Sequence, residues 1–196
     1  MSVPPTLFKK NNNLKMALCE SINLSRNLHC KTGFSGVEFV GFLPKVKGGL
    51  TLTSDDTFEG VGLTGSVYQY EVKNDANIYS VEIVSDENTG TTVYNETLAL
   101  SLPILDKATR NQIKLFAQGK YHAFIQTFDK KILLMGAEYG ATLTAGTMTT
   151  GGARGDMSGF TLTLSSTERR PMVFVGATGS TIYNAAINLT GAITPQ

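Results

Sequence analysis

The sequence predicts a mainly β protein, built as a two-sheet antiparallel β-sandwich or open barrel with one flanking α-helix and an extended N-terminal arm. Three observations lead to this prediction. Runs with a two-residue hydrophobic period follow one another between residues 67 and 175. One segment, 103–118, has the helical period instead. The first 66 residues show little period and contain Pro4-Pro5 and three successive asparagines at 11–13.

Composition limits the class of protein. A chain of 196 residues can fold as one domain that buries roughly 70% of its unfolded surface. Seventeen basic and sixteen acidic residues leave a net charge of +1, so no summed field favours nucleic acid or a membrane surface. No apolar run reaches the ~18 residues of a membrane span. We therefore expect no membrane span, and we expect Cys19 and Cys30 to be reduced thiols.

The hydrophobic period divides the chain into three parts. Residues 1–66 are expected to form the extended arm, partly as strands, because their short apolar pieces cannot make a core of their own. Residues 67–176 are expected to form the β-sandwich. Residues 177–196, which are small and Thr-rich, are expected to form a C-terminal extension.

The first strands of the sandwich are predicted from alternation. Residues 67–73 and 79–83 alternate apolar and polar side chains on either side of the turn Asn74-Asp75, which predicts a hairpin. A third strand, Thr91–Leu102, is expected after the polar turn Ser85–Gly90.

Residues 103–118 predict the helix. Its apolar residues fall within about a third of the helical wheel and are Ile104, Leu105, Ala108, Leu115 and Phe116. Pro103 suits the first helical position, and Gly119 suits the left-handed position after the last turn. Burial of the apolar stripe stabilises by roughly 1.5–3 kcal/mol per large side chain before entropy is subtracted.

Five more runs complete the sandwich, one of which is the short run Ala141–Gly146. Strands are expected at 120–128 and 131–139, joined by a turn. The second is apolar on both faces, which favours a central position or a place at a sheet-on-sheet interface. The strand 158–167 alternates so that Phe160, Leu162 and Leu164 share one face. A short apolar run, Met172–Val175, follows a polar corner.

A long loop is predicted at Thr147–Asp156. About ten residues without hydrophobic period exceed the two to five of an ordinary hairpin, and long ordered loops in compact folds usually serve binding or assembly. The candidates for a contact between subunits or between rings are Thr147, Met148, Thr149, Thr150, Gly151, Gly152, Arg154 and Asp156. The corner Glu168-Arg169-Arg170 is either a second subunit contact, where arginine can pair with carboxylates, or a solvated corner.

The sequence offers no catalytic constellation, so we expect neither enzyme activity nor a cofactor. The chain has two histidines, and His122 is expected to be a packed or surface residue. Cys19, His29 and Cys30 lack a fourth ligand at a plausible spacing, so no metal site is expected. The run GGARGD lacks the Lys-Ser/Thr of a phosphate loop and leads into a strand.

Several motifs between residues 119 and 171 are spaced as in a known family. They are Gly119-Lys120-Tyr121, Leu134-Met135-Gly136, Gly155-Asp156-Met157-Ser158-Gly159-Phe160 and Thr161-Leu162-Thr163-Leu164, with Glu168 and Pro171 beyond. In this pattern the chain resembles tail tube-like virion proteins of tailed bacteriophages, especially phages of Bacteroides-type hosts. The resemblance covers residues 67–175 and leaves open the main tube or a related ring, connector or terminator subunit.

The resemblance implies a structural virion protein made in the host cytoplasm. Six copies are expected to close into a homohexameric ring, and rings are expected to stack around a channel that DNA occupies only transiently. Other tail or connector proteins are the further partners that it implies. In this setting the loop 147–156 would bridge to a neighbouring ring or subunit, and the arm 1–66 would wrap a neighbour.

A β-sandwich module that binds carbohydrate, as in an adhesin or a fibre, is the alternative function. It requires a concave aromatic platform, and Tyr68, Tyr70 and Tyr79 are the candidates for it. Packing in the core is the simpler role for these tyrosines.

Overall fold

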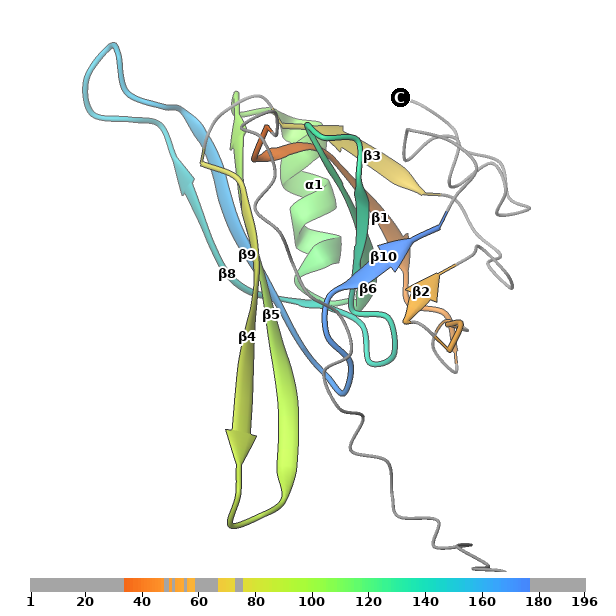
Figure 1. Ribbon diagram of the computed structural model, residues 1–196. Coiled ribbons are helices and arrows are strands. Elements are labelled where there is room, and N and C mark those ends of the chain that lie inside the picture. Colours follow the sequence, from red (N-terminus) through yellow and green to blue (C-terminus); the bar gives the residue numbers. More distant parts are fainter. Residues whose placement is uncertain are drawn as a thin grey trace, which may run out of the picture. The chain divides into compact units, whose positions relative to one another are not determined.

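Two β-sheets and one helix make up the part of the chain that the computed structural model describes. The described residues are 34–47, 50, 52–54, 56–58, 67–72 and 76–176, and all lie in the unit Gly33–Gln196. The strands are β1 (Val37–Pro44), β2 (Thr57–Phe58), β3 (Tyr68–Glu71), β4 (Ile78–Asp86), β5 (Thr91–Pro103), β6 (Tyr121–Thr127), β7 (Ile132–Met135), β8 (Thr142–Thr149), β9 (Gly159–Glu168) and β10 (Val173–Val175), and the helix is α1 (Lys107–Phe116) (Figure 1).

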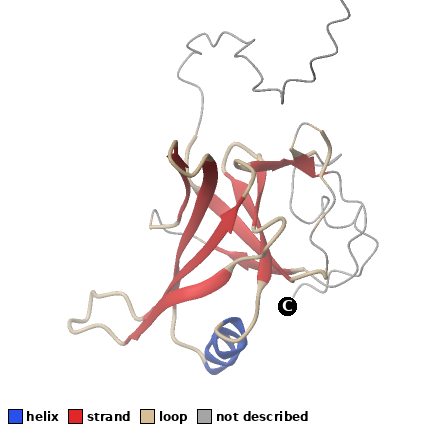
Figure 2. Cartoon of the chain, turned by 90° about the horizontal axis from the view of Figure 1, so that it is seen from below, coloured by secondary structure: helices blue, strands red, loops and turns tan. Residues whose placement is uncertain are grey.

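The strands form two separate sheets. Sheet A has six strands in the order β2-β10-β7-β6-β1-β3, and sheet B has four in the order β4-β5-β9-β8. Strands β10 and β2 are parallel, whereas the other neighbouring pairs are antiparallel. Figure 2 shows the helix to one side of the strands. The prediction of a mainly β sandwich with one helix is confirmed, and neither sheet closes into a barrel.

The main core lies between the two sheets. Sheet B contributes Leu98 from β5 and Leu164 from β9, both fully buried, and sheet A contributes Val40 and Ile125. The alternation predicted for β9 is confirmed, because Phe160, Leu162 and Leu164 are buried while the residues between them are half-buried. Burial of such side chains is the main favourable term in the folding of a sandwich.

A second apolar cluster covers the other face of sheet A. It contains Phe124 from β6 and Leu134 from β7, together with Phe58 and Val173 from the neighbouring strands. Strand β7 is buried at all of its positions, so the prediction that this run lies centrally is confirmed. Strands buried on both faces need apolar residues at successive positions, which is the pattern of the ILLM run.

The arm predicted for residues 1–66 needs a correction. Residues 1–33 and 177–196 lie outside the described residues, but β1 is an inner strand of sheet A, paired with both β3 and β6. Its Val40 is fully buried. The boundary expected at residue 66 is therefore absent, because the run VEFVGFLP puts apolar side chains into both clusters.

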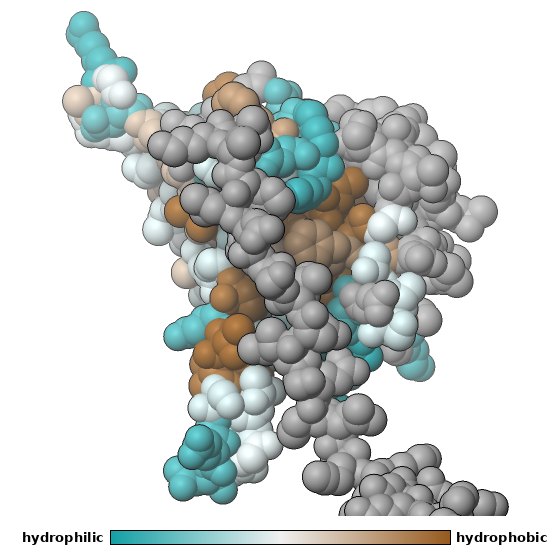
Figure 3. All heavy atoms as spheres, viewed as in Figure 1, coloured by the Kyte–Doolittle hydropathy of each residue, from teal (hydrophilic) through white to brown (hydrophobic). Residues whose placement is uncertain are grey.

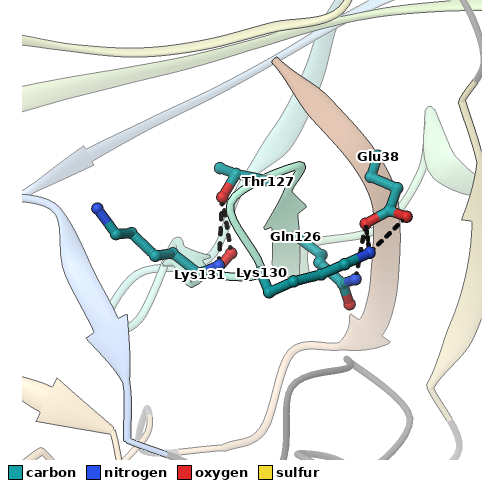
Figure 4. A network of polar contacts seen from close by, with 5 residues as sticks. All are labelled: Glu38, Gln126, Thr127, Lys130 and Lys131. Atoms are coloured by element: carbon teal, nitrogen blue, oxygen red, sulfur yellow. Dashed lines mark hydrogen bonds and ion pairs between the residues drawn. The ribbon is translucent and has the colours of Figure 1, made fainter. Parts of the chain in front are cut away.

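A polar network ties β1 to the turn that follows β6 (Figure 4). Lys130 Nζ lies 2.6 Å from Glu38 Oε2, and Gln126 Nε2 donates to the same oxygen over 2.9 Å. The hydrogen bond from Lys130 holds the pKa of the Glu38 carboxyl below its usual range. The network thus fixes the first described strand to the centre of sheet A.

The hairpin predicted from residues 67–73 and 79–83 is wrong. Strand β3 pairs with β1 in sheet A, with Tyr70 opposite Val40, whereas β4 pairs with β5 in sheet B. The chain passes from one sheet to the other between them. Alternation identifies a half-buried strand but says nothing about which strand lies beside it.

The helix is shorter than predicted. It begins at Lys107, with the Asp106 carboxylate as N-cap accepting from the Thr109 N–H. Pro103 belongs to β5, and Ile104 has a positive φ of 75°, which is incompatible with a helical turn. The buried face consists of Ile113 and Phe116. The ring of Phe116 packs 4.7 Å from that of Phe42.

Candidate assembly surface

Small polar side chains make up much of the outer face of sheet B, which also carries Ile78 and Glu82 of β4. Because Phe160, Leu162 and Leu164 point into the core, the residues between them point outward. We call the following set the hydroxyl face: Ser80 in β4, Thr97 in β5, Thr142, Thr147 and Thr149 in β8, and Thr161, Thr163, Ser165 and Thr167 in β9. The register brings these residues side by side across all four strands.

The hydroxyl face carries no cation. None of the four strands contains Lys or Arg. Its side chains satisfy one another across the strands, as when the Thr147 and Thr161 hydroxyls hydrogen-bond and Thr167 Oγ1 donates to Asn95 Oδ1 over 3.0 Å. The outer face therefore carries no positive charge, and several of its hydroxyls are hydrogen-bonded to their neighbours. Its charged side chains are the acids Glu82 and Asp86 of β4, which alternate with Ser80 on the same side of the strand.

Sheet B has two long edges. Strands β4, of nine residues, and β8, of eight, are its outer strands, and their outer edges pair with no other described strand. Both strands are largely exposed. Large apolar side chains lie on them as well, with Ile78 59% and Ile83 65% exposed on β4 and Met148 55% exposed on β8. Such edges are templates for pairing with another chain.

A groove lies beside the edge strand β4. It has a volume of about 450 Å³, and its apolar lining includes Tyr79 from β4, Ile125 from β6 and Leu133 from β7. Figure 3 shows apolar side chains gathered along this side of the molecule, above the hydrophilic tip of the β4–β5 hairpin.

The long loop predicted at 147–156 is partly a strand. Strand β8 continues to Thr149, with Thr147 opposite Thr161 and Met148 opposite Phe160. The loop proper is residues 150–158. A β-bulge between Leu143 and Ala145 shifts the register, which interrupts the two-residue period and hides the continuation of the strand beyond Gly146.

The loop itself folds on its own residues. Asp156 Oδ2 accepts from the Gly152 N–H over 2.9 Å and from the Ala153 N–H over 2.7 Å, and these hydrogen bonds hold the Asp156 pKa below its usual range. Gly151 has φ 74°. The candidates Thr150, Gly151, Gly152, Arg154 and Asp156 are at the tip of the β8–β9 hairpin. Their contact with another chain stays a prediction.

The corner Glu168-Arg169-Arg170 makes contacts within its own chain. Glu168 is 4% exposed, and its carboxylate accepts from the Glu138 and Tyr139 N–H groups over 3.1 and 3.0 Å. The Arg169 guanidinium lies 5.9 Å from the centre of the Tyr139 ring. Arg170 forms an ion pair with Asp56. A role for this corner in contacts between subunits stays a prediction.

Sequence reasoning missed a second buried carboxyl, Glu96. It is 1% exposed, accepts from the Tyr79 hydroxyl over 2.9 Å, and accepts from the Gly136 N–H over 2.8 Å. Burial raises its pKa to about 7. Glu96 occupies a core-facing position of an alternating strand, between Tyr94 and Leu98, and an acid at such a position was the signal in the sequence.

The two glutamates hold the connection between β7 and β8, residues 136–141. Glu96 and Glu168 together accept three of its backbone N–H groups. A pocket of about 230 Å³ lies beside them. Their hydrogen bonds to the backbone identify the pair as a structural tie between the two sheets.

His122 is a packed histidine. It is fully buried, and Nε2 accepts from the Val46 N–H over 3.1 Å. Nδ1 therefore carries the proton and donates to the Gly136 carbonyl over 2.6 Å. Burial lowers its pKa, so the neutral ring serves as a bridge between main-chain groups.

The three tyrosines of the carbohydrate alternative do not share a surface. Tyr70 packs against Phe42 in the core, with ring centroids 5.6 Å apart, and Tyr68 is 52% exposed on β3 of sheet A. Tyr79 belongs to sheet B and hydrogen-bonds to Glu96.

The described residues indicate no further site. Cys19, His29 and Cys30 lie outside the described residues. Among the residues with described positions, no three His, Cys, Asp or Glu side chains are grouped to hold a metal ion, and no helix is long and apolar enough to cross a membrane. Comparison with protein-family models, with curated protein sequences and with solved structures finds no match to this chain.

Proposed function

We propose that this chain is a structural subunit of a tailed-phage virion that assembles into rings, which stack as the tail tube or a related tail structure. The observation that carries the proposal is sheet B. It combines two long unpaired edges with an outer face that is rich in hydroxyls and carries no Lys or Arg. The family resemblance of residues 67–175 supplies the virion context.

The strand order of sheet B suits closure into a ring. Strands alternate in direction across the sheet, so β4 and β8 run in opposite directions. A neighbour related by rotation about an axis can therefore place its β8 beside β4 and continue the antiparallel alternation. Such a head-to-tail contact closes by rotation, and a closed barrel leaves no exposed edge.

The size of the closed barrel fits a DNA channel. Six copies, as the resemblance implies, would join six four-stranded sheets into a barrel of about 24 strands. With strands about 4.8 Å apart and tilted by 35–45°, its backbone diameter is about 45–50 Å. Barrels with fewer strands already enclose water-filled channels.

The hydroxyl face becomes the channel lining in this arrangement, because the opposite face of sheet B is the core. A lining without Lys or Arg makes no ion pairs with phosphates, so it does not hold DNA in transit. DNA is thus transient content of the channel, and the lasting partners are copies of the chain and other tail or connector proteins. The carbohydrate alternative has no comparable support, since its tyrosines form no common platform.

A matched pair of edge variants tests the proposal. Met148→Lys places a charge on the edge strand β8, and Tyr68→Lys places one on β3, the edge of sheet A; the native side chains are 55% and 52% exposed. We expect rings in electron micrographs of the native chain and the β3 variant, and their loss in the β8 variant, because edge lysines oppose strand pairing.

Sedimentation measures the same assemblies in solution, and circular dichroism checks that each variant is folded. A native chain that stays monomeric at high concentration would contradict the proposal. So would rings that survive Met148→Lys and disappear with Tyr68→Lys.

A further inference from the structure

The β4–β5 hairpin ends in an acidic tip. Glu82, Asp86 and Glu87 are exposed there, and residues 76–106 contain no Lys or Arg. Ile83, beside Glu82, is 65% exposed. We call residues 82–87 the acidic tip; it combines negative charge with apolar surface.

Helix α1 carries the opposite charge. Lys107, Arg110 and Lys114 are all exposed, and their spacing places them on one side of the helix; we call this set the basic face. The helix contains no acidic residue. Within the described ranges none of the three makes an ion pair. Apolar side chains flank the basic face, with Ile104 75% and Leu115 56% exposed.

The acidic tip and the start of the basic face lie at opposite ends of β5. This strand has 13 residues, which span roughly 40 Å at about 3.3 Å per residue, and α1 begins four residues after it ends. Figure 1 shows the hairpin tip well away from the helix. Complementary surfaces at opposite ends of a subunit favour a head-to-tail contact between copies, which propagates along an axis when it does not close by rotation.

We propose that the acidic tip of one copy docks on the basic face of helix α1 of a second copy in the next ring. The inference rests on the proposed function, because it takes the rings from that proposal. It assigns the stacking contact to residues 82–87 and to Lys107, Arg110 and Lys114. Exposed apolar side chains on both surfaces, Ile83 on one and Ile104 on the other, are covered in the same contact.

The contact should be weak in one pair of subunits and strong in a stack. Pairs of exposed charges are screened by salt, with a Debye length of about 10 Å at 0.1 M. Each ring repeats the contact, and linked repeats raise the overall affinity well above that of one pair. Stacks should therefore shorten as salt is added, while the rings, which depend on strand pairing, persist.

Charge reversal on each surface tests the docking. One variant carries Glu82→Lys and Glu87→Lys, another carries Lys107→Glu and Arg110→Glu, and a third combines all four changes in the full chain. Acidic residues in the first turn of a helix are compatible with its dipole, so the second variant keeps its helix. Lys131→Glu, at an exposed position in the turn between β6 and β7, is the charge control.

Electron microscopy counts the rings per stack, and sedimentation measures the same distribution. We expect each separate reversal to shorten stacks at least tenfold with rings intact, the combined variant to restore them, and Lys131→Glu to leave them unchanged. Rings that stack normally in both separate reversals would overturn the inference and leave the proposed function standing, as would a combined variant that fails to restore stacks. A native chain that forms no rings would overturn both.

Discussion

Replacing Glu96 by glutamine tests whether the tie between the two sheets contains a carboxyl that is only partly ionised near neutral pH. Glutamine keeps the shape of the side chain, and its carbonyl oxygen can accept one of the two hydrogen bonds, from the Tyr79 hydroxyl or the Gly136 N–H. What it removes is the ionisation. The native carboxyl is 1% exposed, and burial disfavours its charged form.

The size of the effect follows from the shift in pKa. Burial raises the Glu96 pKa from 4.5 to about 7, so the folded chain binds more protons than the unfolded chain between these values. The stability contributed by the protonated carboxyl is full below about pH 4.5 and is lost as the pH rises through 7. Between pH 5 and pH 8 the loss amounts to roughly 2–3 kcal/mol of unfolding free energy.

Urea denaturation at the two pH values measures this difference. We expect Glu96→Gln and the native chain to have similar free energies of unfolding at pH 5. At pH 8 the free energy of unfolding of the variant should exceed that of the native chain by roughly 2–3 kcal/mol. Glu82→Gln, at an exposed position on the same hairpin, is the control and should show no such gain. If the difference in unfolding free energy between Glu96→Gln and the native chain is the same at pH 5 and at pH 8, the reasoning is refuted.

Three further comparisons probe the fold, each followed by chemical or thermal denaturation. Leu164→Ala in the core of β9 should lower the free energy of unfolding by about 2–5 kcal/mol. Thr163→Ala on the opposite face should lower it by about 1 kcal/mol or less. Equal losses would contradict the assignment of the two faces. Gly136→Ala should lower Tm more than Gly90→Ala, since both glycines have positive φ but only at Gly136 would a Cβ lie 2.6 Å from a main-chain nitrogen. Asp106→Ala should cost about 1 kcal/mol through loss of the helix N-cap, and an unchanged Tm would contradict that role.

Much of the fold could be predicted because burial leaves a period in the sequence. Strand β9 alternates between the core and the hydroxyl face, and its alternation was read correctly. Strand β7 is buried on both sides, and its continuous apolar run predicted a central position. In both strands the burial of successive positions follows a regular pattern. The order of apolar and polar side chains in the sequence is therefore enough to predict which positions are buried.

The failures have physical causes of two kinds. The run Ala141–Gly146 indicated the start of strand β8, but its continuation to Thr149 was missed. A bulge after Leu143 shifts the alternation, and Gly146 fills a core-facing position without an apolar side chain. Strands β3 and β4 were found but wrongly paired, because the choice of partner depends on contacts distant in sequence. The hydrogen bonds from residues 136–141 to Glu96 and Glu168 likewise join three segments that are distant in sequence. No local sequence pattern predicts that these segments lie together.

The candidate surface was predicted only in part. A loop was expected at 147–156 because these residues lack a hydrophobic period, and the loop lies at 150–158. Asp156 holds its turn. The edges β4 and β8 were not expected, because a strand becomes an edge only when the sheet has been assembled. Glu168 was expected in a corner that is either solvated or a subunit contact. Its side chain is instead buried and accepts hydrogen bonds from N–H groups of the β7–β8 connection.

The central claim is that copies of the chain associate through the edges of sheet B. Electron cryomicroscopy of the purified full chain tests this claim most directly. We predict closed rings in which β4 of each subunit lies beside β8 of the next and the hydroxyl face lines the central channel. Particles in which sheet B faces outward, or contacts that leave both of its edges unpaired, would contradict the account.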